Sequence, residues 1–185
     1  KAADDRMDFK KSETYKNLQQ AYDGERLAST KYRLYAEISR KDGYQQIGDI
    51  FDEAAGNEQA HAEIWLRMLN EDTFPMLEEM LQDAGNGEQY EWKQMYRDFA
   101  GTADQEGFHD IAEVFRRIGE VERHYDFRFT QLAENFREGS IFCKQDKEVW
   151  ICLNCGYVIF GKCAPERCPA CGYPQGYFEL NCENF

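Results

Sequence analysis

What the sequence lacks is the first guide to which classes of protein it excludes. It contains no run of about 18 or more apolar residues, the length that a membrane-spanning helix needs. The segment from Lys1 to Lys11 is charged throughout and holds no apolar core of a secretory signal. Basic residues are scarce, 22 against 35 acidic ones, and a net charge of −13 repels nucleic-acid phosphates and anionic lipid headgroups. We therefore expect neither a membrane nor a nucleic-acid partner.

The cysteines are unevenly placed. There are seven, an odd number, and six of them follow residue 150. Two of the spacings are Cys-x-x-Cys, which suits a metal better than a framework of disulfides. This usage predicts a reducing compartment, the cytoplasm.

Composition divides the chain into two domains with a boundary between residues 140 and 148. With 42% apolar residues in 185, the chain can bury a real core. We expect a helical domain at 13–140 and a cysteine-rich domain at 148–185. Residues 1–12 form an N-terminal tail, of which 1–6 are either a cloning remnant or a native frayed end.

Helical periodicity predicts an all-α four-helix bundle ahead of the cysteines. The expected helices cover about 13–41, about 44–70, a third from Gly87 onward, and about 108–137. The segment 71–86 contains Pro75 and is expected to be a long crossover connection.

Each predicted helix places carboxylates on its apolar stripe. The metal-ligand candidates on these stripes are Glu25, Glu58, His61, Glu88, Glu91 and Glu122. One such glutamate on one helix would more simply be a surface residue, but all four helices agree. Burying ionised carboxylates without cations is costly, so the pattern predicts two divalent metals, iron or manganese, with redox chemistry favoured over hydrolysis. His61, three residues after Glu58, projects to the same side of its helix.

The cysteine-rich end contains two near-repeats of one metal-binding knuckle. Cys152 and Cys155 form the first pair and Cys168 and Cys171 the second, each followed by glycine. Four thiolates make one tetrahedral site, and the glycine lets backbone amides approach the sulfurs. Spacing alone leaves both structural zinc and iron open.

The other residues of this end are given ordinary roles. Cys143, Cys163 and Cys182 are expected to be free thiols without function. The small core is expected to consist of Trp150, Tyr157, Tyr173, Tyr177 and Phe178.

Taken together, the motifs resemble the rubrerythrin family from about Met7 to Phe185. The resemblance rests on Gly24-Glu25-Arg26, Glu58-x-x-His61, Glu88-x-x-Glu91-Trp92 with Met95-Tyr96, Glu122, and the two cysteine knuckles. It implies a ferritin-like four-helix bundle holding two iron ions, followed by a small rubredoxin-like β/loop domain that holds one iron on four thiolates. It also implies a non-haem di-iron peroxidase that reduces hydrogen peroxide to water in defence against oxidative stress. No organic cofactor is implied.

Roles carry over from the resemblance position by position. Glu58 and Glu88 match bridging iron ligands, while Glu91 and His61 match two ligands that exchange at one iron when the oxidation state changes. Tyr32 and Tyr96 match tyrosines that hydrogen-bond to the site carboxylates. The candidate catalytic set implied is Glu91, His61, Tyr32 and Tyr96, and the thiolate ligands are Cys152, Cys155, Cys168 and Cys171.

One position departs from the family pattern. The last helix should carry histidine three residues after Glu122, but Tyr125 stands there and His124 precedes it. His124 points about 100° away on a regular helix, so it ligates only if a π-bulge or register slip turns it inward. Otherwise Tyr125 ligates as phenolate, water fills the gap, or this half binds metal weakly.

The resemblance also implies partners. The expected electron donor is an NAD(P)H-dependent reductase or a rubredoxin, and the expected assembly is a head-to-tail homodimer or a dimer of dimers. Two other functions fit the residues: a ferroxidase or iron-binding protein, and a non-catalytic module whose zinc ribbon recruits a partner.

Overall fold

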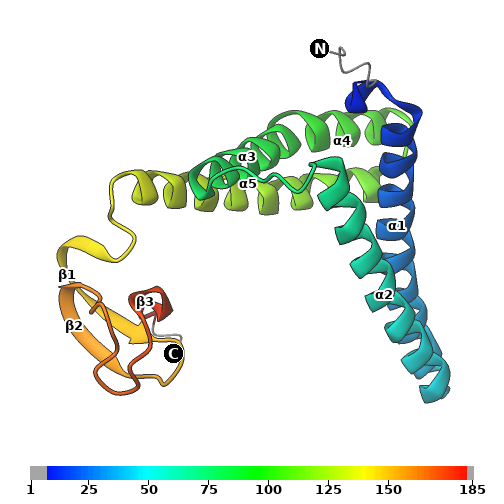
Figure 1. The fold of residues 1–185 in the computed structure, drawn as a ribbon. Helices are drawn as coiled ribbons and strands as arrows, with labels where there is room; N and C mark the ends of the chain where they lie inside the picture. The colour runs from blue at the N-terminus through cyan, green and yellow to red at the C-terminus, as the bar shows by residue number, and fades with distance from the viewer. Residues whose placement is uncertain (1–7, 183–185) are drawn as a thin grey trace, which may run out of the picture. The chain divides into compact units, whose positions relative to one another are not determined.

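The computed structural model describes residues 8–182, and the chain forms two compact units, Lys1–Phe74 and Pro75–Phe185. Figure 1 shows their helices and strands. In chain order the helices are η1 (Phe9–Lys11), α1 (Glu13–Lys41), α2 (Gln45–Leu69), α3 (Leu77–Tyr90), the π-helical turn η2 (Glu91–Met95), α4 (Tyr96–Gln105) and α5 (His109–Arg137). Three of the four predicted helices thus fall within a residue of their expected ends.

The first unit is an antiparallel hairpin of α1 and α2. The start of α1 is capped by the Ser12 hydroxyl, which accepts a hydrogen bond from the Tyr15 amide at 3.0 Å. Small residues let the helices approach closely, because a Cβ at Gly48 would lie 2.7 Å from the Arg40 side chain. Inside the contact, the buried Ser29 hydroxyl donates to the Ala55 carbonyl oxygen at 2.9 Å. This contact fixes α1 against α2 near the ligand positions.

In the second unit, α3, η2 and α4 form one continuous helical run against α5. The chain reverses at Gly107, whose φ of 86° is a conformation that favours glycine. The Trp92 indole N–H in the π turn donates to the Asp126 carboxylate on α5 at 2.8 Å. That hydrogen bond joins the π turn to α5 in the stretch that carries Glu122.

The third helix begins ten residues earlier than predicted, at Leu77 rather than Gly87. Its first turn carries two glutamates, and the Glu79 carboxylate accepts a hydrogen bond from the Met76 amide at 3.0 Å. Gly85 packs against α5, since a Cβ there would lie 3.6 Å from Phe129. The expected long crossover at 71–86 is therefore wrong: the connector is only 70–76.

The C-terminal end folds as a small antiparallel sheet of order β2-β1-β3. Its strands are β1 (Cys143–Cys152), β2 (Val158–Cys163) and β3 (Phe178–Leu180), with a short 3-10 helix, η3 (Gln175–Tyr177), before β3. Trp150 is 1% exposed and packs in the core with Phe178, as predicted. The prediction is wrong for three tyrosines, because Tyr157, Tyr173 and Tyr177 are exposed and do not belong to this core.

Two cysteines assigned as free thiols are paired. Cys143 and Cys163 are register partners on β1 and β2 and form a disulfide. The prediction of free thiols fails for these two because strand pairing brings them opposite each other, which their separation of 20 residues does not reveal. Cys182 is free and exposed.

The predicted fold class is confirmed: the helices of a four-helix bundle are followed by a three-stranded domain with a four-cysteine cluster. The domain bounds 13–140 and 148–185 stay a prediction. Among residues 8–182, no helix is long and apolar enough to span a bilayer.

Candidate metal centres

A first ligand cluster lies on the α1–α2 hairpin. Glu25 comes from α1, and Glu58 and His61 come from α2, with one donor atom of each within 4.8 Å of the others. The His61 Nδ1 is 3.1 Å from a Glu58 oxygen and 3.8 Å from a Glu25 oxygen. Hydrogen bonding with Glu25, and next with His61, lowers the pKa of Glu58. The three groups therefore satisfy one another partly even without a cation.

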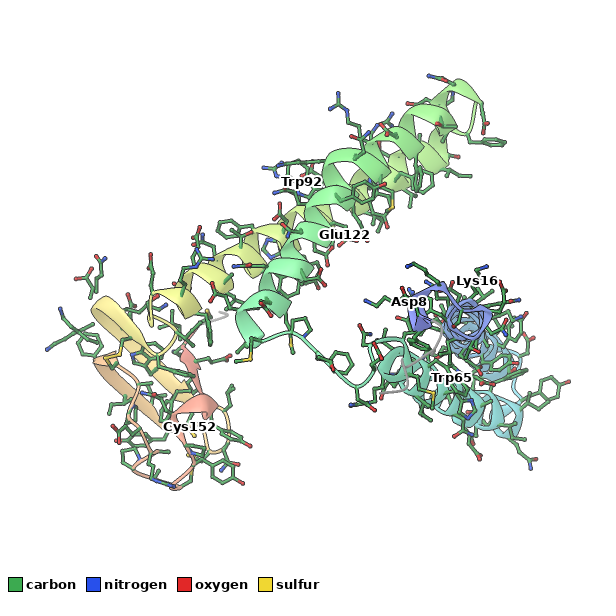
Figure 2. All side chains as sticks on the ribbon, turned by 45° about the horizontal axis from the view of Figure 1, so that its top comes forward. Asp8, Lys16, Trp65, Trp92, Glu122 and Cys152 are labelled. Atoms are coloured by element: carbon green, nitrogen blue, oxygen red, sulfur yellow. A yellow bond between two sulfur atoms is a disulfide. The ribbon has the colours of Figure 1, made fainter. Side chains whose placement is uncertain are left out.

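A second ligand cluster lies on the other unit. Glu88 lies in the last turn of α3, Glu91 begins η2 and Glu122 lies in the middle of α5, and again the donor atoms fall within 4.8 Å of one another. Figure 2 labels Glu122 and the neighbouring Trp92. Partial burial, and then the charges of Glu122 and Glu91, raise the pKa of Glu88. No salt bridge of the described residues reaches these carboxylates, so a cation is the partner that their chemistry calls for.

The π turn explains how Tyr96 comes to face this cluster. In a π turn the amide of residue i+5 bonds to the carbonyl of residue i, and here the Tyr96 amide donates to the Glu91 carbonyl. Tyr96 is thereby turned to the side of Glu91, where an uninterrupted α-helix would rotate it away. Burial, and then the charges of Glu91, Glu122 and Glu88, raise the pKa of Tyr96.

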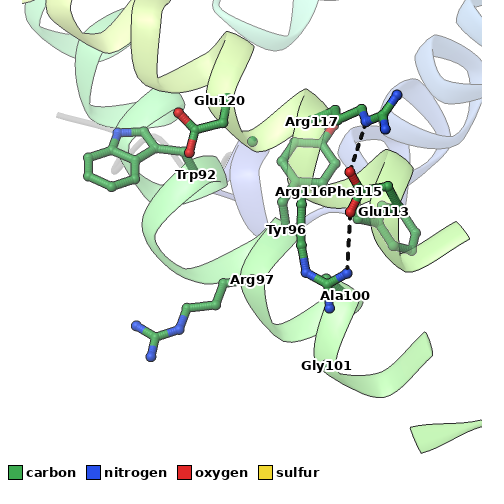
Figure 3. Close-up of a pocket in the computed structure, with 11 residues that line it drawn as sticks. Trp92, Tyr96, Arg97, Ala100, Gly101, Glu113, Phe115, Arg116, Arg117 and Glu120 are labelled. Carbon is green, nitrogen blue, oxygen red and sulfur yellow. Dashed lines mark hydrogen bonds and ion pairs between the residues drawn. The ribbon is translucent and has the colours of Figure 1, made fainter. Parts of the chain in front are cut away.

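Tyr96 also lines a cavity between the two helical runs, together with Trp92 and Phe115 (Figure 3). Arg116 and Arg117 both pair with Glu113 at its edge. The lining contains none of the three carboxylates of the second ligand cluster. The cavity is therefore adjacent to Tyr96 but is not itself the metal centre.

Tyr32 lies on the first unit, where its ring packs 5.9 Å from that of Phe51. Among the hydrogen bonds of residues 8–182, none joins the hydroxyl of Tyr32 or Tyr96 to a site carboxylate. The hydrogen-bonding roles implied for both tyrosines stay predictions.

The departure at Tyr125 has a clear geometry. α5 is an α-helix from His109 to Arg137, and the π turn of this unit lies in the opposite helical run. Tyr125 is 40% exposed, three residues after Glu122, and stacks on Phe129. His124 instead lines a surface cavity with Asp126 and does not join the second ligand cluster. Whether either side chain ligates a metal stays a prediction.

Sequence reasoning missed two positioning residues. Ser29 ties α1 to α2, and Asp126 receives the Trp92 indole. The available signals were weak: Ser29 is a small polar residue on an apolar stripe, and Asp126 is an acid next to the unusual Tyr125. Neither signal names its partner, because both hydrogen bonds join residues far apart in the sequence.

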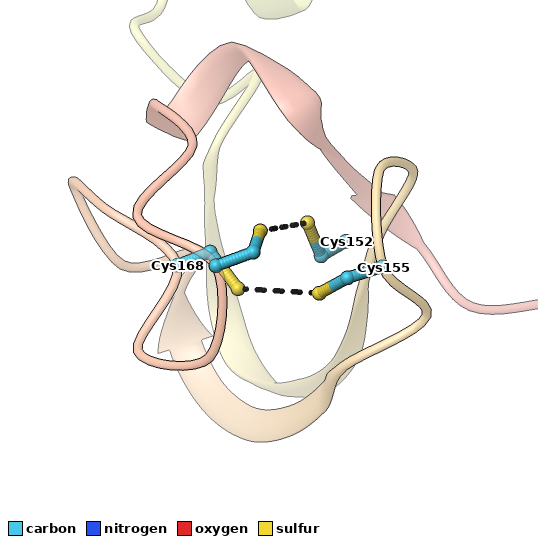
Figure 4. Close-up of side chains that lie close together, drawn as sticks. Cys152, Cys155 and Cys168 are labelled. Atoms are coloured by element: carbon cyan, nitrogen blue, oxygen red, sulfur yellow. Dashed lines mark hydrogen bonds between the residues drawn. The ribbon is translucent and has the colours of Figure 1, made fainter.

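The third cluster is made of thiols. The Cys152 and Cys171 sulfurs lie 3.8 Å apart, and those of Cys155 and Cys168 lie 3.7 Å apart (Figure 4). In each knuckle the glycine after the second cysteine donates its amide to the carbonyl of the first, both at 2.8 Å. Gly156 has φ 74° and Gly172 has φ 76°, which L side chains rarely adopt. The predicted knuckle pair therefore forms as expected.

Backbone amides tune these thiols. A backbone hydrogen bond from Tyr173 is the largest influence on Cys171 and lowers the pKa of its thiol to about 6. A matching bond from Tyr157 lowers the pKa of Cys155, but hydrogen bonding with Cys171 and then burial outweigh it and raise the value to about 12. Cys155 and Cys171 thus hold their protons unequally, as neighbouring thiols of one preformed metal site do.

Two carboxylate clusters on helices and one tetrathiol cluster on a small sheet define the class: a ferritin-like metal protein joined to a rubredoxin-like domain. The rubrerythrin family pattern matches residues 16–133, and the pattern of the rubrerythrin rubredoxin-like domain matches residues 150–179. The chain belongs to the rubrerythrin family, as its motifs predicted.

Several named relatives are similar over nearly their whole length. Rubrerythrin-1 of Clostridium acetobutylicum is 38% identical, with 96% of this chain and 98% of the relative covered. Rubrerythrin of Porphyromonas gingivalis is 40% identical, with coverage of 92% and 91%. A solved structure of nigerythrin in a mixed-valence state is 28% identical, covering 97% of this chain and 91% of that one, with a TM-score of 0.34.

Proposed function

We propose that this protein is a non-haem di-iron peroxidase that reduces hydrogen peroxide to water, with electrons relayed through a rubredoxin-type iron, in defence against oxidative stress. The observation that carries the proposal is the presence of carboxylate and tetrathiol clusters in one chain. Carboxylates with imidazole suit iron that changes oxidation state, and four thiolates suit an electron-transfer iron. Membership of the rubrerythrin family, whose members are generally peroxidases, supports it.

The residues fit two iron ions at the carboxylates. The first ligand cluster offers two carboxylates and one imidazole, and the second offers three carboxylates, which is the ligand set of di-iron bundles except that Tyr125 replaces the second histidine. Burial, and then the charges of Glu122 and Glu91, raise the pKa of Glu88, which fits a place for a cation among these carboxylates. We assign Glu58 and Glu88 as bridging ligands, and Glu91 and His61 as the exchanging pair.

When bound, iron at the carboxylates supplies electrons to the peroxide O–O bond, and iron at the thiolates returns them. Each water formed also needs protons, and Tyr96 is the residue best placed to hold one. Its hydroxyl, turned to the side of Glu91 by the π turn, is protonated at neutral pH as tyrosine ordinarily is, so it can donate a hydrogen bond towards an oxygen at the second ligand cluster.

The partners and location belong to the same proposal. The electron donor is an NAD(P)H-dependent reductase or a rubredoxin, and the chain acts as a homodimer in the cytoplasm. Among residues 8–182, the Cys143–Cys163 disulfide is a bond more common in oxidising compartments.

The relay is tested by Cys155→Ser, which removes one thiolate ligand and leaves the helices untouched. We expect the variant to keep its carboxylate iron, while peroxide turnover driven by a reductase falls to background. Cys182→Ser is the matched control, because Cys182 is exposed and outside the knuckles. Wild-type turnover by Cys155→Ser would remove the relay from the mechanism.

A further inference from the structure

The connector between α2 and α3 is unusually short for this fold. A ferritin-like bundle has one long crossover, because two of its successive helices run in the same direction. The connections at 42–44 and 106–108 are tight turns inside the antiparallel packing of each unit. The crossover therefore falls between Leu69 and Leu77, where only residues 70–76 are available.

The ligand positions set how far this connector would have to reach. Glu58 lies 11 residues before Leu69, and Glu88 lies 11 residues after Leu77. At about 1.5 Å per residue, each helix extends about 16 Å beyond the ligand level. If α2 and α3 of one chain ran parallel with their ligands level, the connector would have to span about 33 Å.

The connector cannot cover that span. From Leu69 to Leu77 the chain makes eight Cα steps, which reach at most about 26–29 Å when fully extended. It is also far from extended, because the Asp72 amide donates to the Arg67 carbonyl at 2.9 Å and the Thr73 amide to the Asn70 carbonyl at 2.8 Å. Closing the fold within one chain would therefore unwind the helix ends.

Both units expose an apolar face on the side of their ligands. On α2 the exposed large side chains of this face are Ile47, Ile50, Ile64 and Met68. On α5, at about 100° per residue, those on the side of Glu122 are Ile111, Val114, Ile118, Val121, Tyr125, Leu132 and Phe136. A continuous exposed apolar face of this kind marks a surface that another element covers.

We infer that a second copy of this chain completes the site: the α1–α2 hairpin of one chain packs on α3–α5 of its partner, and two such bundles form per dimer. Each di-metal site then takes Glu25, Glu58 and His61 from one chain and Glu88, Glu91 and Glu122 from the other. The inference rests on the proposed di-metal function, and it requires no crossover along the bundle. A dimer built by exchange of identical elements is a common solution of this kind.

Complementation between two inactive variants tests the exchange. Glu58→Gln damages only the first ligand cluster, and Glu88→Gln damages only the second. The two variants are co-expressed with different tags, the mixed dimer is purified through both tags, and ferrous iron is added without oxygen. Iron in excess of the thiolate site is then measured by elemental analysis.

Exchange predicts about half of the wild-type carboxylate iron in the mixed dimer, because one bundle receives both mutations and the other receives none. Each variant alone should hold little. The matched control pairs Glu58→Gln with the double variant Glu58→Gln/Glu88→Gln and should regain none. A second pair, Glu25→Gln with Glu122→Gln, should behave like the first.

Two results would overturn the inference: a mixed dimer with no more carboxylate iron than its parents, or a monomeric wild-type protein that fills both clusters. These differ from failure of the proposed function, in which the wild-type protein itself takes up no carboxylate iron.

Discussion

The two carboxylate clusters have nearly the same composition but opposite electrostatics. In the first, hydrogen bonding with Glu25, and next with His61 at 3.1 Å, lowers the pKa of Glu58. In the second, three carboxylates face one another without an imidazole, and burial, followed by the charges of Glu122 and Glu91, raises the pKa of Glu88. Within the described residues, the first ligand cluster thus contains a hydrogen-bonding partner for its carboxylates, whereas the second contains repulsion that a bound cation would relieve.

The largest expected effect of a substitution at either carboxylate cluster is loss of bound iron. We expect Glu88→Gln to remove carboxylate iron and peroxidase turnover together, because Glu88 is a proposed bridge and its loss leaves two acids at the second ligand cluster. Iron content and peroxide consumption of the same samples provide the measurement. The control is Glu120→Gln, which changes an exposed carboxylate on α5 that only pairs with Arg123. Full iron loading by Glu88→Gln would contradict the ligand assignment.

A smaller effect should come from restoring the imidazole that the second ligand cluster lacks. Tyr125→His places a histidine three residues after Glu122, and we expect ferrous affinity at this cluster to rise about tenfold, as measured by anaerobic titration. His124→Ala is the matched control and should leave the affinity unchanged, since His124 lines a different cavity. If His124→Ala instead abolished binding, the geometry of α5 would have to differ from the one described.

The smallest effect concerns the metal-free protein. Glu88 keeps its proton more tightly when folded, so its contribution to stability is favourable at low pH and is lost as the pH rises above its ordinary pKa of 4.5. Glu88→Gln should therefore raise the free energy of unfolding at neutral pH by about 0.5–1 kcal/mol. Denaturant titrations should show this gain shrinking as the pH falls.

Glu58→Gln should change the stability of the metal-free protein in the opposite direction to Glu88→Gln. A lowered pKa means that ionised Glu58 stabilises the fold above its unfolded pKa, and that this contribution disappears as the pH falls through the folded value. The substitution should lower the stability of the metal-free protein at neutral pH. The same sign of change at both clusters would contradict the comparison.

Most helix bounds and both cysteine knuckles were predictable from local sequence patterns. The bounds of α1, α2 and α5 follow from period and end signals, and the knuckles follow from cysteine spacing with glycine. The early start of α3 was not predictable from Gly85 and Gly87, because burial of Gly85 against α5 outweighs its low helix propensity.

The remaining features depend on partners distant in the sequence. The Cys143–Cys163 disulfide follows from strand register. The direction of the Tyr96 side chain follows from a π turn, which the α-helical period of 3.6 residues does not predict. The connector of 70–76 likewise follows from the start of α3 at Leu77, which the sequence does not indicate.

The iron content and visible spectrum of the protein purified without oxygen show whether it is a di-iron peroxidase with a rubredoxin-type iron. We expect about three irons per chain and a ferric thiolate chromophore that a reductant bleaches and hydrogen peroxide restores. One thiolate-bound metal with no iron at Glu58 or Glu88, or a colourless protein that peroxide does not change, would contradict it.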